Sequence, residues 1–372
     1  MNSIKMVDLH KQYLGIRPEI DKAIEDVLTS TAFIQGPQVA EFAEALGRYV
    51  GAEKVIPCAN GTDALQIALM ALDLKIGDEV IVPVFTYVAT AEVIALLGLT
   101  PVFVDVDENN FNIDVNQIEK VITQKTKAIV PVHLFGQCAD MEPLLKIAVK
   151  HNLYVIEDAA QALGAQYSFF DGSVKRAGTM STIGTTSFFP SKNLGCYGDG
   201  GAIFTNDPAL AEKIKMITNH GQRIKYHHDI IGVNSRLDTM QAAILNVKLK
   251  YLSVYTDRRN RVASFYEANL SEEYLHMPVR AKNSTHVFHQ FTVRINGRSR
   301  DDFQKHLTAN GIPFMIYYPV PLHLQKAYKR PGFGEGSFPV TEKLSKTVIS
   351  LPIHTEMEPD QLAFICDTIN KF

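Results

Sequence analysis

Cysteine is scarce in this 372-residue sequence, and its four cysteines lie far apart from one another. Cys58, Cys138, Cys196 and Cys366 show no paired spacing, which argues against both a disulfide framework and a zinc site. Unpaired cysteines suit a reducing compartment. We therefore expect a cytoplasmic protein without structural disulfides and without a bound metal.

A marked excess of charge and a membrane-spanning apolar run are also absent. The net charge of −3 gives no reason to expect nucleic acid or an anionic membrane as a partner. The N-terminal residues contain no apolar core of signal-peptide length. The one long apolar stretch, residues 80–106, is interrupted by two prolines, a glutamate and a glycine, which favours strand–helix–strand over a membrane span.

A dinucleotide-binding motif is missing as well. No Gly-x-Gly-x-x-Gly sequence follows a first strand, and the glycines within 195–201 precede a predicted strand rather than open a helix. This pattern argues against a nicotinamide-dependent oxidoreductase, although such an enzyme would also alternate strands and helices.

That alternation fills most of the first 220 residues. We predict strands at 54–58, 79–82, 101–104, 128–131 and 154–157, with helices between them at 62–72, 89–97, 116–122 and 141–151. Asp140 and Asp207 are predicted to cap the helices that follow them. The alternation predicts an α/β fold with a mostly parallel sheet covered on both faces.

The chain is longer than a single core usually serves, so we expect two domains. A helical pattern from Leu237 to about Leu270 leads into strand-like segments at 286–295 and 312–316, a helix at 300–309, a loop at 330–338 and a last helix from Pro359. We therefore divide the chain into a large domain, residues 1–250, and a smaller C-terminal α+β domain, residues 251–372. The N-terminal segment can pack on the smaller domain.

Two residues carry the main chemical signal. Lys192 follows a predicted buried strand and enters a glycine-rich loop, 34 positions after Asp158. Such a lysine can bind an aldehyde cofactor covalently, and an aspartate at the end of an earlier strand can keep a pyridine nitrogen protonated. Pyridoxal-phosphate chemistry needs both, although a solvated surface group explains an isolated lysine of this kind better.

Other polar and aromatic residues follow predicted strands at their carboxyl ends, where open α/β sheets bind ligands. Gly61 and Thr62 open a helix whose free N–H groups can bind a phosphate. Ser187 can add a hydroxyl to that phosphate, Tyr87 can lie against a pyridine ring, and Gln161 can reach the ring hydroxyl. A simple helix cap and ordinary aromatic packing are the alternatives for the first two motifs.

The segment 220–236 is unusually basic. It has one acid, Asp229, against six potentially basic side chains (His220, Arg223, Lys225, His227, His228 and Arg236). It is either a solvated loop or an anion-binding loop that serves a diphosphate or a carboxylate. The spacing of its histidines fits no metal site.

Six motifs occur in a fixed order along the chain: Ala59-Asn-Gly-Thr-Asp-Ala-Leu65, Thr86-Tyr-Val-Ala-Thr90, Glu157-Asp-Ala-Ala-Gln161, Ser187-Phe-Phe-Pro-Ser-Lys192, Gly232-Val-Asn-Ser-Arg-Leu-Asp238 and Tyr318-Pro-Val-Pro-Leu-His323. In this order they resemble the fold-type I pyridoxal-phosphate aminotransferases that act on nucleotide-linked keto-sugars (the DegT/DnrJ/EryC/StrS type). The resemblance covers nearly the whole chain.

The resemblance implies pyridoxal 5′-phosphate as cofactor, glutamate as amino donor and a nucleotide sugar as acceptor. It implies that Lys192 binds the cofactor, that Asp158 pairs with the pyridinium, that Tyr87 stacks on the ring, and that Gly61, Thr62 and Ser187 hold the phosphate. Asn234 is implied to reach the phosphate in a neighbouring subunit, which requires a homodimer. Relatives that remove a sugar hydroxyl carry histidine in place of this lysine, so Lys192 argues against a dehydratase.

Within the family, Leu194-Gly-Cys-Tyr-Gly-Asp-Gly-Gly201 and Tyr226-His-His228 are most similar to the branch acting on UDP-linked 2-acetamido-2-deoxy-3-oxo-glucuronate, in surface polysaccharide or lipopolysaccharide precursor synthesis. We expect Arg236 to pair with the sugar carboxylate. The full set of expected substrate contacts is Thr31, Phe33, Ser191, Arg236, Tyr317 and Tyr318.

Two departures from that branch leave other sugars open. Phe33 stands where the branch has tyrosine, and Tyr317 stands where it has histidine. A dTDP-linked 3-keto-6-deoxy sugar or a 4-keto sugar is therefore an alternative acceptor. A regulator that binds the cofactor without catalysis is the alternative from another class of protein.

Overall fold

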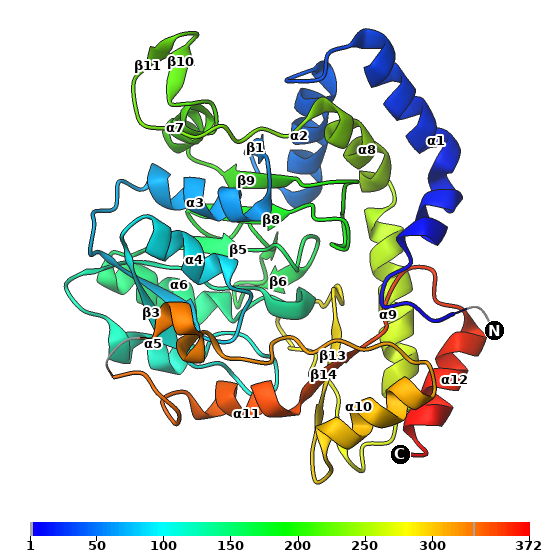
Figure 1. Cartoon of the computed structure of the whole chain (residues 1–372). Coiled ribbons are helices and arrows are strands. Elements are labelled where there is room, and N and C mark those ends of the chain that lie inside the picture. The colour runs from blue at the N-terminus through cyan, green and yellow to red at the C-terminus, as the bar shows by residue number, and fades with distance from the viewer. Residues whose placement is uncertain (1–2, 330–331) are drawn as a thin grey trace.

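The chain begins with two helices that the sequence analysis did not predict. The computed structural model describes residues 3–329 and 332–372 (Figure 1). Helix α1 (Leu9–Ser30) runs beside α8 (Thr239–Leu249), and α2 (Pro37–Val50) packs on α8 as well. The buried side chains of Ile16, Ile20, Ile244 and Val247 join α1 to α8.

A seven-stranded sheet forms the centre of the large region. Its strands are β1 (Lys54–Cys58), β2 (Glu79–Pro83), β3 (Thr100–Val104), β4 (Thr126–Ile129), β5 (Tyr154–Asp158), β8 (Ile183–Ser187) and β9 (Gly201–Thr205). They lie in the order β1-β9-β8-β5-β4-β2-β3. Strand β9 is antiparallel to both of its neighbours, and the strands from β8 to β3 pair in parallel.

Successive side chains of a strand point to opposite faces of the sheet, and helices cover both faces, so the side chains on each face are buried. On one face, Val80, Val82 and Ile203 pack with α3 (Gly61–Ala71), α4 (Ala89–Leu96) and α7 (Pro208–Thr218). On the other, Ile81 and Val155 pack with α5 (Val115–Val121) and α6 (Met141–His151). The predicted α/β fold with a mostly parallel, doubly covered sheet is confirmed.

The predicted strands and helices of this region agree with the structure to within two residues at each end. The predicted cap at Asp207 is also present, since its side chain accepts hydrogen bonds from the N–H groups of Ala209 and Leu210. The prediction that the Asp140 side chain caps α6 is wrong. Its carboxylate accepts hydrogen bonds from the Tyr167 hydroxyl (2.5 Å) and the Asn283 amide (2.9 Å), and it makes no capping bond to α6.

A smaller antiparallel sheet lies in the C-terminal region, in the order β12 (Leu275–His276), β13 (Phe291–Ile295) and β14 (Val348–Leu351). It packs with α9 (Leu252–Asn269), α10 (Arg300–Ala309) and α12 (Pro359–Ile369). Helix α11 (Pro339–Thr347) leads into β14. The N-terminal Ile4 packs on this C-terminal core.

Three predictions for the C-terminal region need correction. The helical pattern of 237–270 forms two helices, α8 and α9, because the chain turns at Lys250 and Tyr251. Only Phe291–Ile295 of the strand-like segment 286–295 is a strand. Residues 312–316 form no strand, and Met315 makes only an isolated bridge to Ser350. Within the predicted loop 330–338, residues 330 and 331 lie outside the described residues, and 332–338 form no helix or strand.

Two hairpins complete the structure, β6 (Gln166–Ser168) with β7 (Val174–Arg176), and β10 (Gln222–Ile224) with β11 (His227–His228). The β10–β11 hairpin, which belongs to the basic segment, projects away from the body of the molecule (Figure 1). In the part of the chain that the structure describes, no helix is long and apolar enough to cross a membrane. No group of metal-ligating side chains occurs among those residues either.

Candidate active site

A cavity of about 630 Å³ opens at the carboxyl ends of β1, β2, β5 and β8. Parallel strands end at one edge of a sheet, so residues that follow different strands meet there. Ten predicted site residues line this cavity: Gly61, Thr62, Tyr87, Asp158, Gln161, Ser187, Ser191, Lys192, Tyr317 and Tyr318. The structure therefore brings together residues that are up to 257 positions apart in the sequence (61 to 318).

Lys192 lies in the loop between β8 and β9. Its backbone N–H donates to the carbonyl of Phe189 (2.8 Å), which fixes the turn that aims the side chain into the cavity. Burial lowers the pKa of the Lys192 amine to about 8, and the negative charge of Asp158 opposes this shift. Desolvation disfavours the charged form of a lysine, so a substantial fraction of the amine is neutral near neutral pH.

Asp158 ends β5 and is 6% exposed. Its Oδ2 atom accepts a hydrogen bond from the Thr90 hydroxyl (2.9 Å), and its Oδ1 atom accepts one from the N–H of Ala160 (3.1 Å). Burying a carboxylate costs free energy unless hydrogen bonds or an opposite charge compensate. These bonds and the nearby Lys192 supply both.

The start of α3 forms one end of the cavity. The Asn60 side chain accepts a hydrogen bond from the N–H of Asp63 (2.8 Å), so the helix cap that was the alternative explanation of this motif is present. The cap uses the N–H of Asp63 and not those of Gly61 and Thr62, which belong to the first turn of the helix, where helices bind anions. A Cβ atom on Gly61 would lie 2.6 Å from Cβ of Ser187, so only glycine lets the Ser187 hydroxyl come this close to the helix start.

Aromatic residues and one amide also line the cavity. Tyr87 is 57% exposed, and its ring centroid lies 6.4 Å from that of Tyr318. Gln161 donates from Nε2 to the Tyr318 hydroxyl (3.1 Å), and its Oε1 atom accepts from the N–H of Phe135 (2.9 Å). Tyr317 lines the cavity as well.

Thr86 and His289 also line the cavity, and neither was predicted to be a site residue. The Thr86 hydroxyl and the Nδ1 atom of His289 are buried and have no hydrogen-bond partner within the described residues. Burial, together with the charges of Lys192 and Arg259, lowers the pKa of His289 well below its usual range, so its ring is neutral. Thr86 stood inside a quoted motif, but no local signal predicts that His289 of the C-terminal region faces Lys192.

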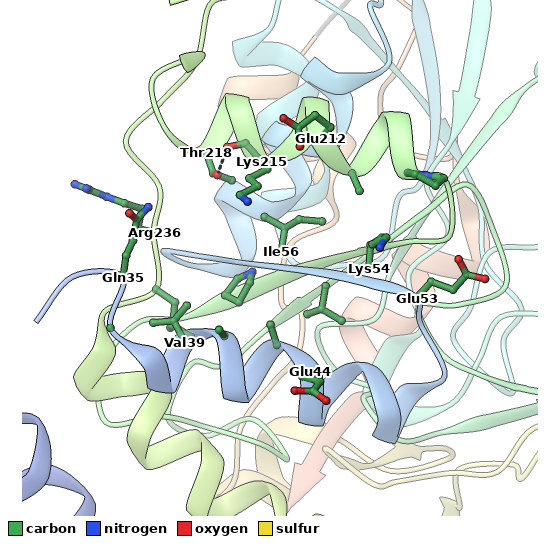
Figure 2. Close-up of a pocket in the computed structure, with 18 residues that line it drawn as sticks. Gln35, Val39, Glu44, Glu53, Lys54, Ile56, Glu212, Lys215, Thr218 and Arg236 are labelled. Carbon is green, nitrogen blue, oxygen red and sulfur yellow. Dashed lines mark hydrogen bonds between the residues drawn. The ribbon is translucent and has the colours of Figure 1, made fainter. Parts of the chain in front are cut away.

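Four predicted site residues lie outside the cavity: Thr31, Phe33, Asn234 and Arg236. Arg236 instead lines a groove of about 800 Å³ between α2, β1 and α7. Figure 2 shows this groove, with the Arg236 side chain extending away from its floor near Ile56. These four residues therefore lie apart from the Lys192 of their own chain, and their predicted roles in the site stay predictions.

Those four residues nevertheless come from two segments that lie against each other. The carbonyl of Phe33 accepts a hydrogen bond from the N–H of Thr239 (3.0 Å), and Ile34 forms a bridge with Asp238. Thr31, Phe33 and Asn234 are exposed, and Arg236 is half-buried. We call the surface formed by residues 31–35 and 234–236 the lateral surface.

The cavity fits a phosphorylated pyridine aldehyde. A helix N-terminus with an adjacent hydroxyl suits the phosphate, a buried carboxylate suits a protonated ring nitrogen, and a partly neutral lysine amine suits the aldehyde. The buried, unpartnered Thr86 hydroxyl also points to a polar occupant. Fold and site together thus define the class of pyridoxal-phosphate enzymes.

Comparison with known proteins identifies the family. Residues 15–370 match the DegT/DnrJ/EryC1/StrS aminotransferase family. The chain is 47% identical over 368 residues to the UDP-2-acetamido-2-deoxy-3-oxo-D-glucuronate aminotransferase of Pseudomonas aeruginosa, covering 99% of this chain and 100% of that protein. It is 46% identical over 373 residues to a pleiotropic regulatory protein of Geobacillus stearothermophilus, covering 100% and 98%.

Solved structures agree with this result. DesV of Streptomyces venezuelae, solved in complex with a ketimine intermediate, matches with a TM-score of 0.95 and 41% identity, covering 100% of this chain and 98% of that one. NtdA of Bacillus subtilis, solved with bound cofactor PMP, matches with a TM-score of 0.90 and 31% identity, covering 99% and 85%.

The chain therefore belongs to the DegT/DnrJ/EryC1/StrS aminotransferase family. It is a nucleotide-sugar aminotransferase, and its cofactor is pyridoxal 5′-phosphate. The family, fold class and cofactor predicted from the sequence are confirmed.

Proposed function

We propose that this enzyme transfers the amino group of glutamate to C3 of UDP-2-acetamido-2-deoxy-3-oxo-glucuronate, in the synthesis of a surface polysaccharide or lipopolysaccharide precursor. The observation that carries the catalytic part is the placement of the Lys192 amine and the Asp158 carboxylate in one cavity beside the start of α3.

Bound pyridoxal 5′-phosphate supplies an electron sink and carries the amino group between the two half-reactions. Lys192 would hold the cofactor, and its amine, once free, would take the proton from the α-carbon of glutamate. In the cofactor-free protein the cavity lowers the pKa of this amine to about 8, and a general base works best when its pKa is close to the ambient pH. Asp158 keeps the ring nitrogen protonated.

The remaining cavity residues bind and orient. The N–H groups of Gly61 and Thr62 and the Ser187 hydroxyl bind the phosphate, and Tyr87 covers one face of the ring. Gln161, held between Phe135 and Tyr318, faces the ring hydroxyl. Ser191, Tyr317 and Tyr318 face the sugar.

The sugar assignment rests on three observations. The motifs of residues 194–201 and 226–228 are similar to those of this branch, and the relative from Pseudomonas aeruginosa carries this activity in its name. The exposed basic hairpin and Arg236 supply cations for a diphosphate and a carboxylate. Phe33 and Tyr317 favour the alternatives, a dTDP-linked 3-keto-6-deoxy sugar or a 4-keto sugar.

The acceptor can be identified directly. The enzyme is first aminated with glutamate, freed of excess donor, and offered each keto-sugar nucleotide in turn. We expect the UDP-linked 3-oxo-glucuronate to be aminated fastest, with the new amine at C3 by NMR of the product. Faster amination of a dTDP-linked or 4-keto sugar would refute this assignment and leave the aminotransferase assignment intact.

We further propose that the enzyme works as a homodimer, in which the lateral surface of one subunit completes the cavity of the other. Asn234 then reaches the partner's phosphate site, and Thr31, Phe33 and Arg236 reach the partner's sugar. Thr31, Phe33 and Asn234 are exposed and Arg236 is half-buried, and all four lie outside the cavity of their own subunit, which supports this arrangement. We also propose the division of the chain at residue 250, in the turn between α8 and α9.

Mixed dimers test the sharing of sites. Lys192→Ala and Asn234→Ala are each expected to be inactive, but a dimer of the two has one intact site if Asn234 acts across the interface. Co-refolding equal amounts should restore about a quarter of wild-type activity, because about half of the dimers are mixed and each has one intact site of two. Lys192→Ala with Asp158→Asn is the matched control and should restore nothing. No recovery in the first mixture would refute the shared site.

A regulator that binds the cofactor without turnover is the alternative that the name of the pleiotropic regulatory protein favours, and the match to the aminotransferase family stands against it. It predicts a bound cofactor whose absorption spectrum glutamate leaves unchanged.

A further inference from the structure

Thr90 joins two elements of the active site through its side chain. It lies in the first turn of α4, three residues after Tyr87, and is 1% exposed. Its Oγ1 atom donates a hydrogen bond to Oδ2 of Asp158 over 2.9 Å. The bond connects the segment that follows β2 to the end of β5, 68 positions further along the chain.

This hydroxyl has no other task that the structure reveals. A threonine inside a helix often donates to the carbonyl four residues earlier, yet the Thr90 hydroxyl donates to the Asp158 carboxylate. The hydroxyl does not cap α4, whose N-cap residue Val88 makes no side-chain bond. The neighbours Ala91, Val93 and Ile94 belong to the apolar core, where a valine would fit without a polar partner.

The bond also determines how the carboxylate faces the cavity. Asp158 has one oxygen bonded to Thr90 and the other bonded to the N–H of Ala160 (3.1 Å). With a donor on each oxygen, the plane of the carboxylate is fixed and its negative charge is supported. Each oxygen keeps a lone pair for a further donor. Without the Thr90 hydroxyl, the side chain could rotate about its Cβ–Cγ bond and lose charge stabilisation.

We propose that Thr90 is a positioning residue, which holds the Asp158 carboxylate in place against the ring nitrogen of the cofactor and so sustains the electron sink. The inference rests on the proposed role of Asp158 and assigns a function to Thr90, the last residue of the motif at 86–90. Thr90 itself touches neither the reacting atoms nor the substrate.

The test compares Thr90→Val, which keeps the shape and removes the hydroxyl, with Thr90→Ser, which keeps the hydroxyl. Thr185→Val is the matched control, because Thr185 is also 1% exposed and its hydroxyl donates to the Glu157 carbonyl (3.0 Å) rather than to the carboxylate of Asp158. Each protein is loaded with pyridoxal 5′-phosphate labelled with ¹⁵N in the ring. The ¹⁵N chemical shift, which reports protonation of the ring nitrogen, is then measured against pH.

We expect Thr90→Val to move the ¹⁵N shift toward the unprotonated value and to raise the dissociation constant of the cofactor roughly tenfold, as expected for losing a hydrogen bond to a charged group. Thr90→Ser and Thr185→Val should keep the wild-type ¹⁵N shift.

A wild-type ¹⁵N shift in Thr90→Val would overturn the inference, even if that variant melts at a lower temperature, because a purely structural role changes stability alone. An unprotonated ring nitrogen in the wild-type enzyme would instead refute the proposed role of Asp158, and failure of the wild-type enzyme to bind the cofactor would refute the proposed function itself.

Discussion

The chemical state of Lys192 gives a prediction that can be tested without substrate or cofactor. Burial lowers the pKa of its amine from 10.5 to about 8. At pH 7, a pKa of 8 leaves roughly 10% of the amine neutral, whereas a pKa of 10.5 leaves roughly 0.03%, a difference of about 300-fold. Only the neutral amine attacks an electrophile, so Lys192 of the cofactor-free enzyme should be acylated far faster at pH 7 than an ordinary lysine.

The assay is brief acylation at a series of pH values, followed by mass spectrometry of the peptide that contains Lys192. The rate should rise with a midpoint near pH 8 in the folded protein and near pH 10.5 in the urea-unfolded protein, which is the matched control. Replacing Asp158 by Asn should move the folded midpoint below 8, because the carboxylate raises the pKa of the amine. A folded midpoint near 10.5, or an upward move in the Asn variant, would refute the account of this site.

Three other variants test separate parts of the structure. Gly61→Ala places a Cβ atom 2.6 Å from Cβ of Ser187, so it should weaken cofactor binding at least tenfold and lower the unfolding free energy by about 1–3 kcal/mol. Cofactor titration measures the first effect and urea unfolding the second. Unchanged cofactor binding would contradict the close contact between the helix start and Ser187. Arg236→Ala should raise KM for the acceptor roughly 100-fold, because charge-assisted hydrogen bonds worth about 2–3 kcal/mol are lost, and it should not slow amination of the enzyme by glutamate. An equal loss of catalytic efficiency in both half-reactions would contradict a role limited to the sugar nucleotide. Glu157→Gln should lower the unfolding free energy by about 3 kcal/mol, because this buried carboxylate accepts hydrogen bonds from four groups, the N–H of Gly178, the N–H of Met180, the Ser181 hydroxyl and the His133 ring. A midpoint of urea unfolding equal to that of the wild type would contradict this prediction.

The pKa of Lys192 also affects the stability of the cofactor-free protein. Between about pH 8 and 10.5 the unfolded chain holds a proton on this lysine that the folded chain has lost, so stability rises with pH across that window. Lys192→Met should remove this rise. A slope that is the same in both proteins would show that Lys192 does not titrate differently on folding.

The large region was predictable because its elements alternate with clear local signals. Short β-branched runs bury both faces of the sheet, and the side chains that follow them gather at one edge. Lys192 and Asp158 could therefore be paired from sequence alone. The helix start at Gly61 was predictable for the same reason, since its capping residue follows a strand directly.

Most of the missed features depend on contacts between distant parts of the chain. Helix α1 has a local signal that the prediction overlooked, because Asp8 caps it and Ile16, Ile20 and Val27 are buried at helical spacing; its packing on α8 is the part that depends on distant residues. Asp140 has good capping chemistry, but Tyr167 and Asn283 occupy its oxygens. His289 reaches the cavity only because the C-terminal region closes one wall of it. The predicted site residues of the lateral surface lie outside the cavity that contains Lys192 of the same chain. The spacing of residues along the sequence does not show whether they lie inside or outside it.

The most direct test of the central claim is the absorption spectrum of the pyridoxal-phosphate-loaded enzyme before and after glutamate is added. In the wild-type enzyme we expect the band of the lysine-bound cofactor to disappear and the pyridoxamine band to rise, and we expect a keto-sugar nucleotide then to restore the first band. Lys192→Ala should fold as the wild type does and show neither change. A lysine-bound band that glutamate leaves unaltered in the wild type would contradict amino transfer from this donor.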